Sequence, residues 1–98
     1  MNKSDLLQVS EENIRKILVK HLPADTAVYL FGSRARGDGR WNSDFDLWVD
    51  AVLPSETIVE IGEDLENSIV PFEVDIVTTD QLKGEFGKRV TQEAIQWM

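Results

Sequence analysis

Acidic and apolar residues alternate from Asp44 to Leu47, and Trp48 and Val49 extend the segment; this pattern restricts the fold more than any other feature of the chain. Successive side chains of a β-strand point to opposite faces of the sheet. Three apolar residues of the segment therefore face a core: Phe45, Leu47 and Val49. Asp44 and Asp46 share the other face, with Cα atoms about 6.6 Å apart at a rise of about 3.3 Å per residue. The segment predicts a half-buried strand that carries two neighbouring carboxylates.

A third carboxylate lies in a later segment with the same alternation, Phe72–Val77. Its apolar residues predict a core face, and Asp75 falls on the opposite face. If the two strands are neighbours, Asp44, Asp46 and Asp75 lie on one side of one sheet. Clustered carboxylates repel one another unless a cation lies among them. Mg²⁺ fits such a site because it combines a few carboxylates with water and nucleotide phosphates, and the spacing suits two ions about 3.5–4 Å apart.

Gly32 and Ser33 follow a β-branched and aromatic run, Thr26–Phe31, that we predict to be a strand. Ten residues separate this turn from Asp44. A glycine lets a phosphate approach the backbone closely, and its combination with the carboxylates favours nucleotidyl transfer. Taken separately, each part has an ordinary structural explanation. The turn would only end a strand, and acids on an edge strand would only keep the protein soluble.

The composition narrows the choice of function. A length of 98 residues predicts one domain, residues 1–98. Cysteine is absent, which excludes disulfides, thiolate zinc sites and a cysteine nucleophile. No apolar run approaches the roughly 20 residues that span a bilayer and no signal peptide is evident, so we expect a cytoplasmic protein without membrane contact. The 18 acidic and 10 basic residues give a net charge of −8, which argues against direct nucleic-acid binding.

The elements expected along the chain follow the order α-β-β-α-β-α. We predict a first helix that is capped by Ser10 and ends before Pro23, and a second that starts after Pro54. A last helical region is expected from Thr79 through Trp97. The predicted fold class is α/β (α+β), a small mixed β-sheet of three or more strands with helices packed mainly on one face. The acids would lie in an open cleft.

Two segments together carry a family resemblance: Gly32–Gly37, followed by Ser43–Leu47. They resemble the signature of the minimal nucleotidyltransferases (MNT) of the DNA polymerase β superfamily. The segment Glu73–Val77 is similar to the strand that holds the third carboxylate of that superfamily. The resemblance covers nearly the whole chain and implies a polymerase β-like nucleotidyltransferase core. It is specific to the superfamily and does not identify a substrate.

The resemblance also implies roles for individual residues. Asp44 and Asp46 would hold the metal ions, two Mg²⁺ in this type of site. Asp75 would share one of these ions and help to deprotonate the incoming nucleophile. The three aspartates are therefore the expected catalytic and metal-binding residues. Gly32 and Ser33 would bind the phosphates of a nucleoside triphosphate, with ATP as the expected substrate.

Two arginines of the loop are further candidates for nucleotide binding. Arg34 and Arg36 each carry a guanidinium, which matches the geometry of phosphate. Each of them equally well offsets nearby acids or lies in solvent. Trp41 either stacks on a base or packs under the loop. Tyr29 and His21 are expected at the edge of the core.

A partner protein is also implied by the resemblance. Minimal nucleotidyltransferases are commonly paired with a separately encoded, all-helical HEPN-type protein. In such HEPN/MNT toxin–antitoxin pairs the antitoxin transfers AMP to a tyrosine of the HEPN ribonuclease toxin, so a protein adenylyltransferase is expected here. Two alternatives remain open. One is nucleotidyl transfer to a small molecule such as an aminoglycoside, and the other is a non-catalytic subunit that neutralises its partner by binding.

Overall fold

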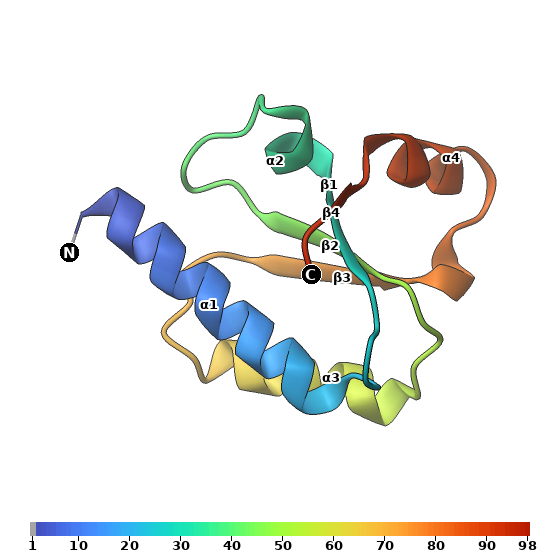
Figure 1. Ribbon diagram of the computed structural model, residues 1–98, viewed down its shortest axis with the longest axis horizontal. Helices are drawn as coiled ribbons and strands as arrows, with labels where there is room; N and C mark the ends of the chain where they lie inside the picture. Colours follow the sequence, from blue (N-terminus) through green and yellow to red (C-terminus); the bar gives the residue numbers. More distant parts are fainter. Residues whose placement is uncertain (1) are drawn as a thin grey trace.

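The computed structural model describes residues 2–98 and is built around one mixed β-sheet (Figure 1). Its four strands are β1 (Val28–Phe31), β2 (Phe45–Val49), β3 (Val74–Thr78) and β4 (Ile95–Gln96). They lie in the order β3-β2-β1-β4. β2 is antiparallel to β1 and parallel to β3, and β4 is antiparallel to β1. The predicted mixed sheet is confirmed, and the two strands with alternating acids are neighbours.

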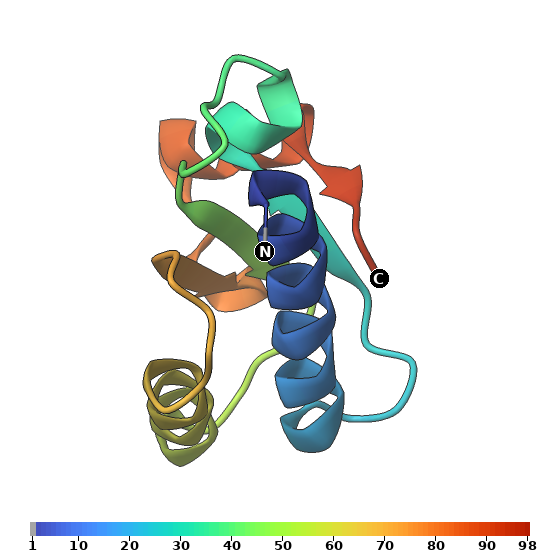
Figure 2. The same ribbon diagram turned by 90° about the vertical axis from the view of Figure 1, so that its left-hand side faces the viewer.

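The helices form layers on the two sides of this sheet. The two longest, α1 (Lys3–His21) and α3 (Ser55–Glu66), lie side by side and cover one face (Figure 1). The helices α2 (Gly32–Arg36) and α4 (Gly84–Glu93) lie next to each other on the other side (Figure 2). A short 3₁₀ helix, η1 (Thr79–Gln81), connects β3 to α4. Within residues 2–98 no helix is both long and apolar enough to cross a membrane.

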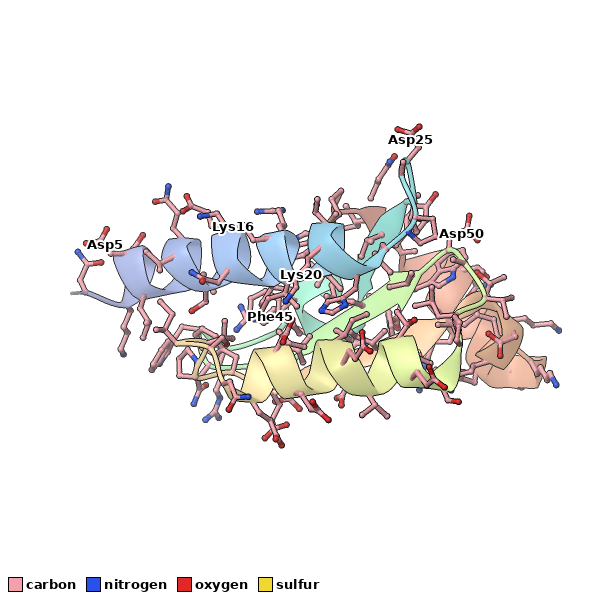
Figure 3. All side chains as sticks on the ribbon, turned by 90° about the horizontal axis from the view of Figure 1, so that it is seen from below. Asp5, Lys16, Lys20, Asp25, Phe45 and Asp50 are labelled. Atoms are coloured by element: carbon pink, nitrogen blue, oxygen red, sulfur yellow. The ribbon has the colours of Figure 1, made fainter. Side chains whose placement is uncertain are left out.

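Alternation along β2 produces the core as predicted. Phe45, Leu47 and Val49 are at most 1% exposed, and they pack with residues of α1 and α3. Figure 3, viewed from the side of these helices, shows Phe45 between them. A register slip of one residue would turn these side chains toward solvent, and burial of each contributes about 1.5–3 kcal/mol. The apolar face therefore fixes the register that places Asp46 on the opposite face.

The first helix begins earlier than predicted. It starts at Lys3, and Asn2 is its N-cap, with the Asn2 side chain accepting a hydrogen bond from the Asp5 amide at 2.8 Å. Ser10, predicted as the cap, is buried in the middle of the helix. The acids after Ser10 imitate a helix start, but Leu7 packs against the core one turn earlier and extends the apolar stripe.

The C-terminal region is not one helix to Trp97 as predicted. α4 ends at Glu93, Ala94 is extended, and β4 follows. Trp97 and Val28 are joined by a backbone hydrogen bond of 2.8 Å. Without the last residues the outer edge of β1 would leave backbone groups unpaired, and the pairing satisfies both partners. The short strand was missed because two residues carry too little pattern to identify.

Candidate active site

Asp46 and Asp75 lie directly opposite each other on the parallel strands β2 and β3. Both are on the face turned away from the core formed by α1 and α3. Burial raises the pKa of Asp46, and the charges of Asp75 and Asp44 raise it further, while Arg36 acts in the opposite direction. The two facing carboxyl groups are close enough to hydrogen-bond when one of them is protonated. The structure therefore joins two of the three predicted acids into a pair.

Asp44 lies differently from the other two acids. It is exposed and precedes the first residue of β2, although its charge acts on Asp46. Among residues 2–98, no three acidic, histidine or cysteine side chains converge in the arrangement of a metal site. The structure thus brings Asp46 and Asp75 together and leaves Asp44 beside them.

Gly32 is packed against the Asp46 carboxylate. Its φ of +76° lies in the left-handed region, which disfavours side chains. A Cβ at this position would overlap with Oδ2 of Asp46. Gly32 opens α2, and Gly37, also left-handed, closes it. The glycine of the predicted phosphate turn is therefore required by the site itself.

Ser33 organises the loop that follows. Its carbonyl oxygen accepts hydrogen bonds from the amides of Gly37, Asp38 and Gly39, at 3.0, 3.2 and 3.1 Å. This cluster of bonds ends α2 and turns the chain back toward β2. The residue itself lines the same cleft as Asp46 and Asp75.

The two arginines of the predicted site point to different surroundings. Arg34 holds the loop, because its guanidinium donates to the carbonyl oxygens of Ser43, at 2.6 and 2.9 Å, and of Trp41, at 2.7 Å. It also lies 4.2 Å from the ring centroid of Phe45 and does not line the cleft. Arg36 does line the cleft. Of the two, only Arg36 is positioned beside the acid pair.

Trp41, considered above for base stacking, packs against neighbouring side chains of the loop region. Its ring lies edge-on to Phe72, with centroids 5.9 Å apart. The Lys3 ammonium lies 4.9 Å from the centre of the same ring. The indole remains 42% exposed. Trp41 therefore packs at the loop, the second of the two arrangements expected for it.

Glu93 is a site residue that the sequence pattern did not reveal. Its carboxylate accepts hydrogen bonds from the Gly32 amide at 3.0 Å and from Arg36 Nη1 at 2.9 Å. Burial acts to raise the pKa of Glu93, but the bonds from Arg36 and Gly32 outweigh it, and the pKa is lowered. Glu93 thus ties the end of α4 to the start of α2. Nothing near it in the sequence indicates this contact, since 61 positions separate it from Gly32.

These residues line one open cleft of about 450 Å³, within the range of small-molecule sites. Acidic, basic and apolar groups all contribute to its surface. The lining residues are Phe31, Gly32, Ser33, Arg36, Asp46, Asp75, Val77, Phe86, Arg89 and Glu93. Phe86, an apolar residue of the predicted last helical region, is 38% exposed and faces this cleft.

Comparison with known families places this geometry in context. The family model for polymerase β-type nucleotidyltransferases matches residues 12–96, which include every strand of the sheet. The chain belongs to this nucleotidyltransferase family. A search of curated protein sequences found no significant match for this nucleotidyltransferase.

Solved structures of related nucleotidyltransferases share the fold. A chain in the crystal structure of a toxin–antitoxin complex with AMP-PNP is 29% identical, with a TM-score of 0.69, and the match covers 89% of this chain and 72% of that one. A chain in the complex of a tri-AMPylated HEPN toxin from Shewanella oneidensis with an MNT antitoxin is 26% identical, with a TM-score of 0.66 and coverage of 93% and 71%. A protein named as a candidate minimal nucleotidyltransferase is 29% identical, with a TM-score of 0.67 and coverage of 97% and 95%.

Proposed function

We propose that this chain is a Mg²⁺-dependent nucleotidyltransferase that transfers AMP from ATP to a hydroxyl of a partner protein and releases pyrophosphate. The partner would be a HEPN-type helical toxin, and the chain would act as its antitoxin. The observation that carries the proposal is the pairing of Asp46 with Asp75 beside Gly32 and Ser33 in one cleft. A chain that only bound a partner would need none of this arrangement.

The acid pair fits divalent cations. Burial and neighbouring acids raise the pKa of Asp46, so the ionised pair is costly without a positive charge. Carboxylate oxygens are preferred ligands of Mg²⁺, which needs only one or two of them when water and phosphates complete its shell. Asp46 and Asp75 would hold the ions, two in this type of site, and Asp44 would contribute from the adjoining position. Bound Mg²⁺ would neutralise charge on the phosphates and lower the pKa of the attacking hydroxyl.

Other residues of the cleft and its loop would bind the phosphates, accept the proton of the acceptor and support the site. Gly32 allows the backbone to come close to a ligand, and Ser33 presents its amide and hydroxyl to the phosphates. Arg36 is already at the cleft and can exchange its carboxylate partners for phosphate oxygens. Asp75 is the exposed member of the pair and would accept the proton of the acceptor hydroxyl. Arg34 would support the site indirectly by holding the loop.

The identity of the donor and acceptor is supported by the relatives. One related structure contains AMP-PNP, an analogue of ATP, and another contains an AMPylated HEPN toxin together with an MNT antitoxin. Both are at least 26% identical to this chain over about nine-tenths of its length. This similarity supports AMP as the transferred group and a HEPN-type protein as the acceptor.

The test uses α-³²P-ATP, Mg²⁺ and the product of the neighbouring gene. Label is expected on the partner, on a tyrosine, and only when wild-type chain is present. Asp46→Ala should abolish labelling, whereas Asp50→Ala should not, because Asp50 lies at the other end of β2 and is exposed (Figure 3). Co-purification with the partner checks that both variants still form the complex. If both variants neutralise the partner and no label appears with wild type, the chain is a binding protein and the proposal is wrong.

A further inference from the structure

The wall of the cleft opposite the β-strands is formed by one stripe of α4. Phe86, Arg89 and Glu93 are three and four residues apart, the spacing that places side chains on one helix face. All three line the cleft together with Asp46 and Asp75. Helical spacing alone predicts a core position for Phe86 and no role for Arg89 or Glu93, so this stripe is not explained by the family signature.

The orientation of this stripe is fixed by the buried side of α4. Val90 is fully buried. Gly87 lies against the Leu82 backbone so closely that a Cβ would be 2.7 Å from the Leu82 carbonyl carbon. Any side chain at this position would push α4 away from the connection that precedes it. The tight packing holds Phe86 and Arg89 toward the cleft.

Arg89 is a cleft guanidinium whose charge acts on Glu93, one turn further along α4, without forming an ion pair with it. Arg36 is paired with Asp38 at 3.2 Å and with Glu93 at 2.9 Å. Among residues 2–98, by contrast, no acidic side chain forms an ion pair with Arg89, whose guanidinium lies 5.8 Å from the Phe86 ring centroid. A cleft that already holds acids needs cations to accept an anionic ligand. Arg89 supplies a guanidinium that does not have to break an ion pair first.

Phe86 supplies an apolar surface beside the phosphate turn. Its ring meets Phe31 edge-on, with centroids 6.3 Å apart, and Phe31 directly precedes Gly32. The ring is nevertheless 38% exposed and lines the cleft. Aromatic rings that stack with nucleobases contribute about 1–3 kcal/mol per base. An exposed ring, an unpaired guanidinium and an acid pair in one cleft match the three parts of a metal-bound nucleotide.

We infer that α4 is the second wall of the nucleotide site, with Arg89 contacting the β- and γ-phosphates and Phe86 packing against the nucleoside. The inference rests on the proposed function, because it assigns residues to the nucleotide that the enzyme would use. It extends that function to an element outside the signature segments. Nucleotide affinity and selectivity would then depend on residues 86 and 89 as well as on the aspartates.

Binding of Mg²⁺ with AMP-PNP, measured by calorimetry, tests this assignment. Arg89→Ala should weaken binding about tenfold, the effect of removing one charged hydrogen bond. Arg89→Lys should recover part of the loss. The matched control is Lys88→Ala, which removes the same charge from the adjacent, 72% exposed side chain, and its effect should stay below about twofold. Thermal unfolding checks that each variant is folded.

Measuring AMP binding in the same variants distinguishes the phosphate contact of Arg89 from the nucleoside contact of Phe86. Arg89→Ala should weaken AMP-PNP binding much more than AMP binding, because AMP has no β- or γ-phosphate. Phe86→Ala should weaken both by about tenfold, and Phe86→Leu should weaken both less.

If wild type binds neither ligand, the proposed function fails and this inference fails with it. If wild type binds and the Phe86 and Arg89 variants behave like Lys88→Ala, the inference alone is overturned. If the Phe86 and Arg89 variants keep wild-type nucleotide affinity but no longer co-purify with the partner protein, the inference is also wrong. The stripe would then be a protein-binding surface.

Discussion

The carboxylate of Glu93 accepts a hydrogen bond from the Gly32 amide at 3.0 Å, so the last turn of α4 is attached to the first residue of α2. The same carboxylate is bonded to Arg36. An amide and a guanidinium at the edge of a cleft are the donors that a phosphate would also use. In the structure described here, Glu93 therefore occupies donors that an incoming nucleotide would compete for.

Replacement of Glu93 tests this competition. Glu93→Gln keeps an acceptor for the Gly32 amide but removes the charge that holds Arg36. We expect Mg²⁺–AMP-PNP to bind about threefold more tightly, the scale of one solvent-screened charge contact. The melting temperature without nucleotide should fall slightly. Calorimetric titration measures the first effect and a thermal melt the second. Glu85→Gln is the control, because its side chain on the same helix is 92% exposed. Weaker binding by Glu93→Gln would instead show that Glu93 positions the site.

Gly32→Ala is expected to damage the site more than the fold. The added Cβ would overlap with the Asp46 carboxylate and would also have to adopt a left-handed φ. The backbone strain alone costs about 1–2 kcal/mol of unfolding free energy. The displaced carboxylate should abolish the nucleotide-dependent rise in melting temperature, which for wild type corresponds to about 2.7 kcal/mol at a hundredfold excess over Kd.

Gly37→Ala is the matched control for this substitution. Its φ of +83° imposes similar backbone strain, but no atom beyond its neighbours in the chain lies within 4 Å of the added Cβ. We expect a similar loss of stability in chemical denaturation and an unchanged response to Mg²⁺–AMP-PNP. Equal responses of the two variants to nucleotide would contradict the role assigned to Gly32.

Asp46→Asn should stabilise the metal-free protein at pH 7 and not at pH 3.5. Burial, followed by the charges of Asp75 and Asp44, raises the pKa of Asp46 above its value of about 3.9 in an unfolded chain. The folded protein therefore holds this proton to a higher pH than the unfolded chain does. The unfolding free energy of wild type then falls as the pH rises from about 4 through the folded-state pKa.

The amide that Asp46→Asn introduces does not ionise, so the variant avoids this loss. Because the pair is partly exposed, we expect a gain of no more than about 1 kcal/mol at pH 7. Urea unfolding at the two pH values measures it, with Asp50→Asn, at the exposed position directly after β2, as the control. An equal difference between wild type and Asp46→Asn at both pH values would show that ionisation of Asp46 is not the cause.

Arg34→Lys should loosen the loop between α2 and β2. The guanidinium bonds to carbonyl oxygens of Ser43 and Trp41 and lies over Phe45. A lysine keeps the charge but cannot bridge both carbonyls in this planar arrangement. We expect a loss of about 1–2 kcal/mol of unfolding free energy, measured by chemical denaturation. Hydrogen exchange at the Ser43 amide should become faster. If Arg34→Lys is as stable as wild type, Arg34 does not hold this loop.

The strands that carry the acids were predictable because their evidence is local. Alternation in Asp44–Val49 fixes which residues are buried, and burial of Phe45 and Leu47 leaves Asp46 no other face. The same reasoning places Asp75, and the parallel register then brings the two together. Gly32 was expected to be a glycine so that a phosphate can approach the backbone; in the structure its left-handed φ and the adjacent Asp46 carboxylate require one.

The second wall of the cleft could not be predicted in the same way. Phe86 is apolar and has helical spacing to Val90, so the sequence alone places both in the core, whereas only Val90 is buried. The contact of Glu93 with Gly32 depends on how α4 is placed over the sheet, which no local pattern encodes. Arg34 and Arg36 are two residues apart and equally basic, and only the tertiary structure separates a loop-holding residue from a cleft residue.

The pairing of β4 with β1 has a consequence for the order in which the molecule matures. β4 holds the segment after α4 against the strand that leads into Gly32. A nascent chain that has folded only through β3 can align Asp46 with Asp75 but still lacks Phe86, Arg89 and Glu93. Binding of a nucleotide by the complete cleft therefore reports that α4 and β4 have docked. During synthesis on the ribosome, the site would mature among the last parts of the fold.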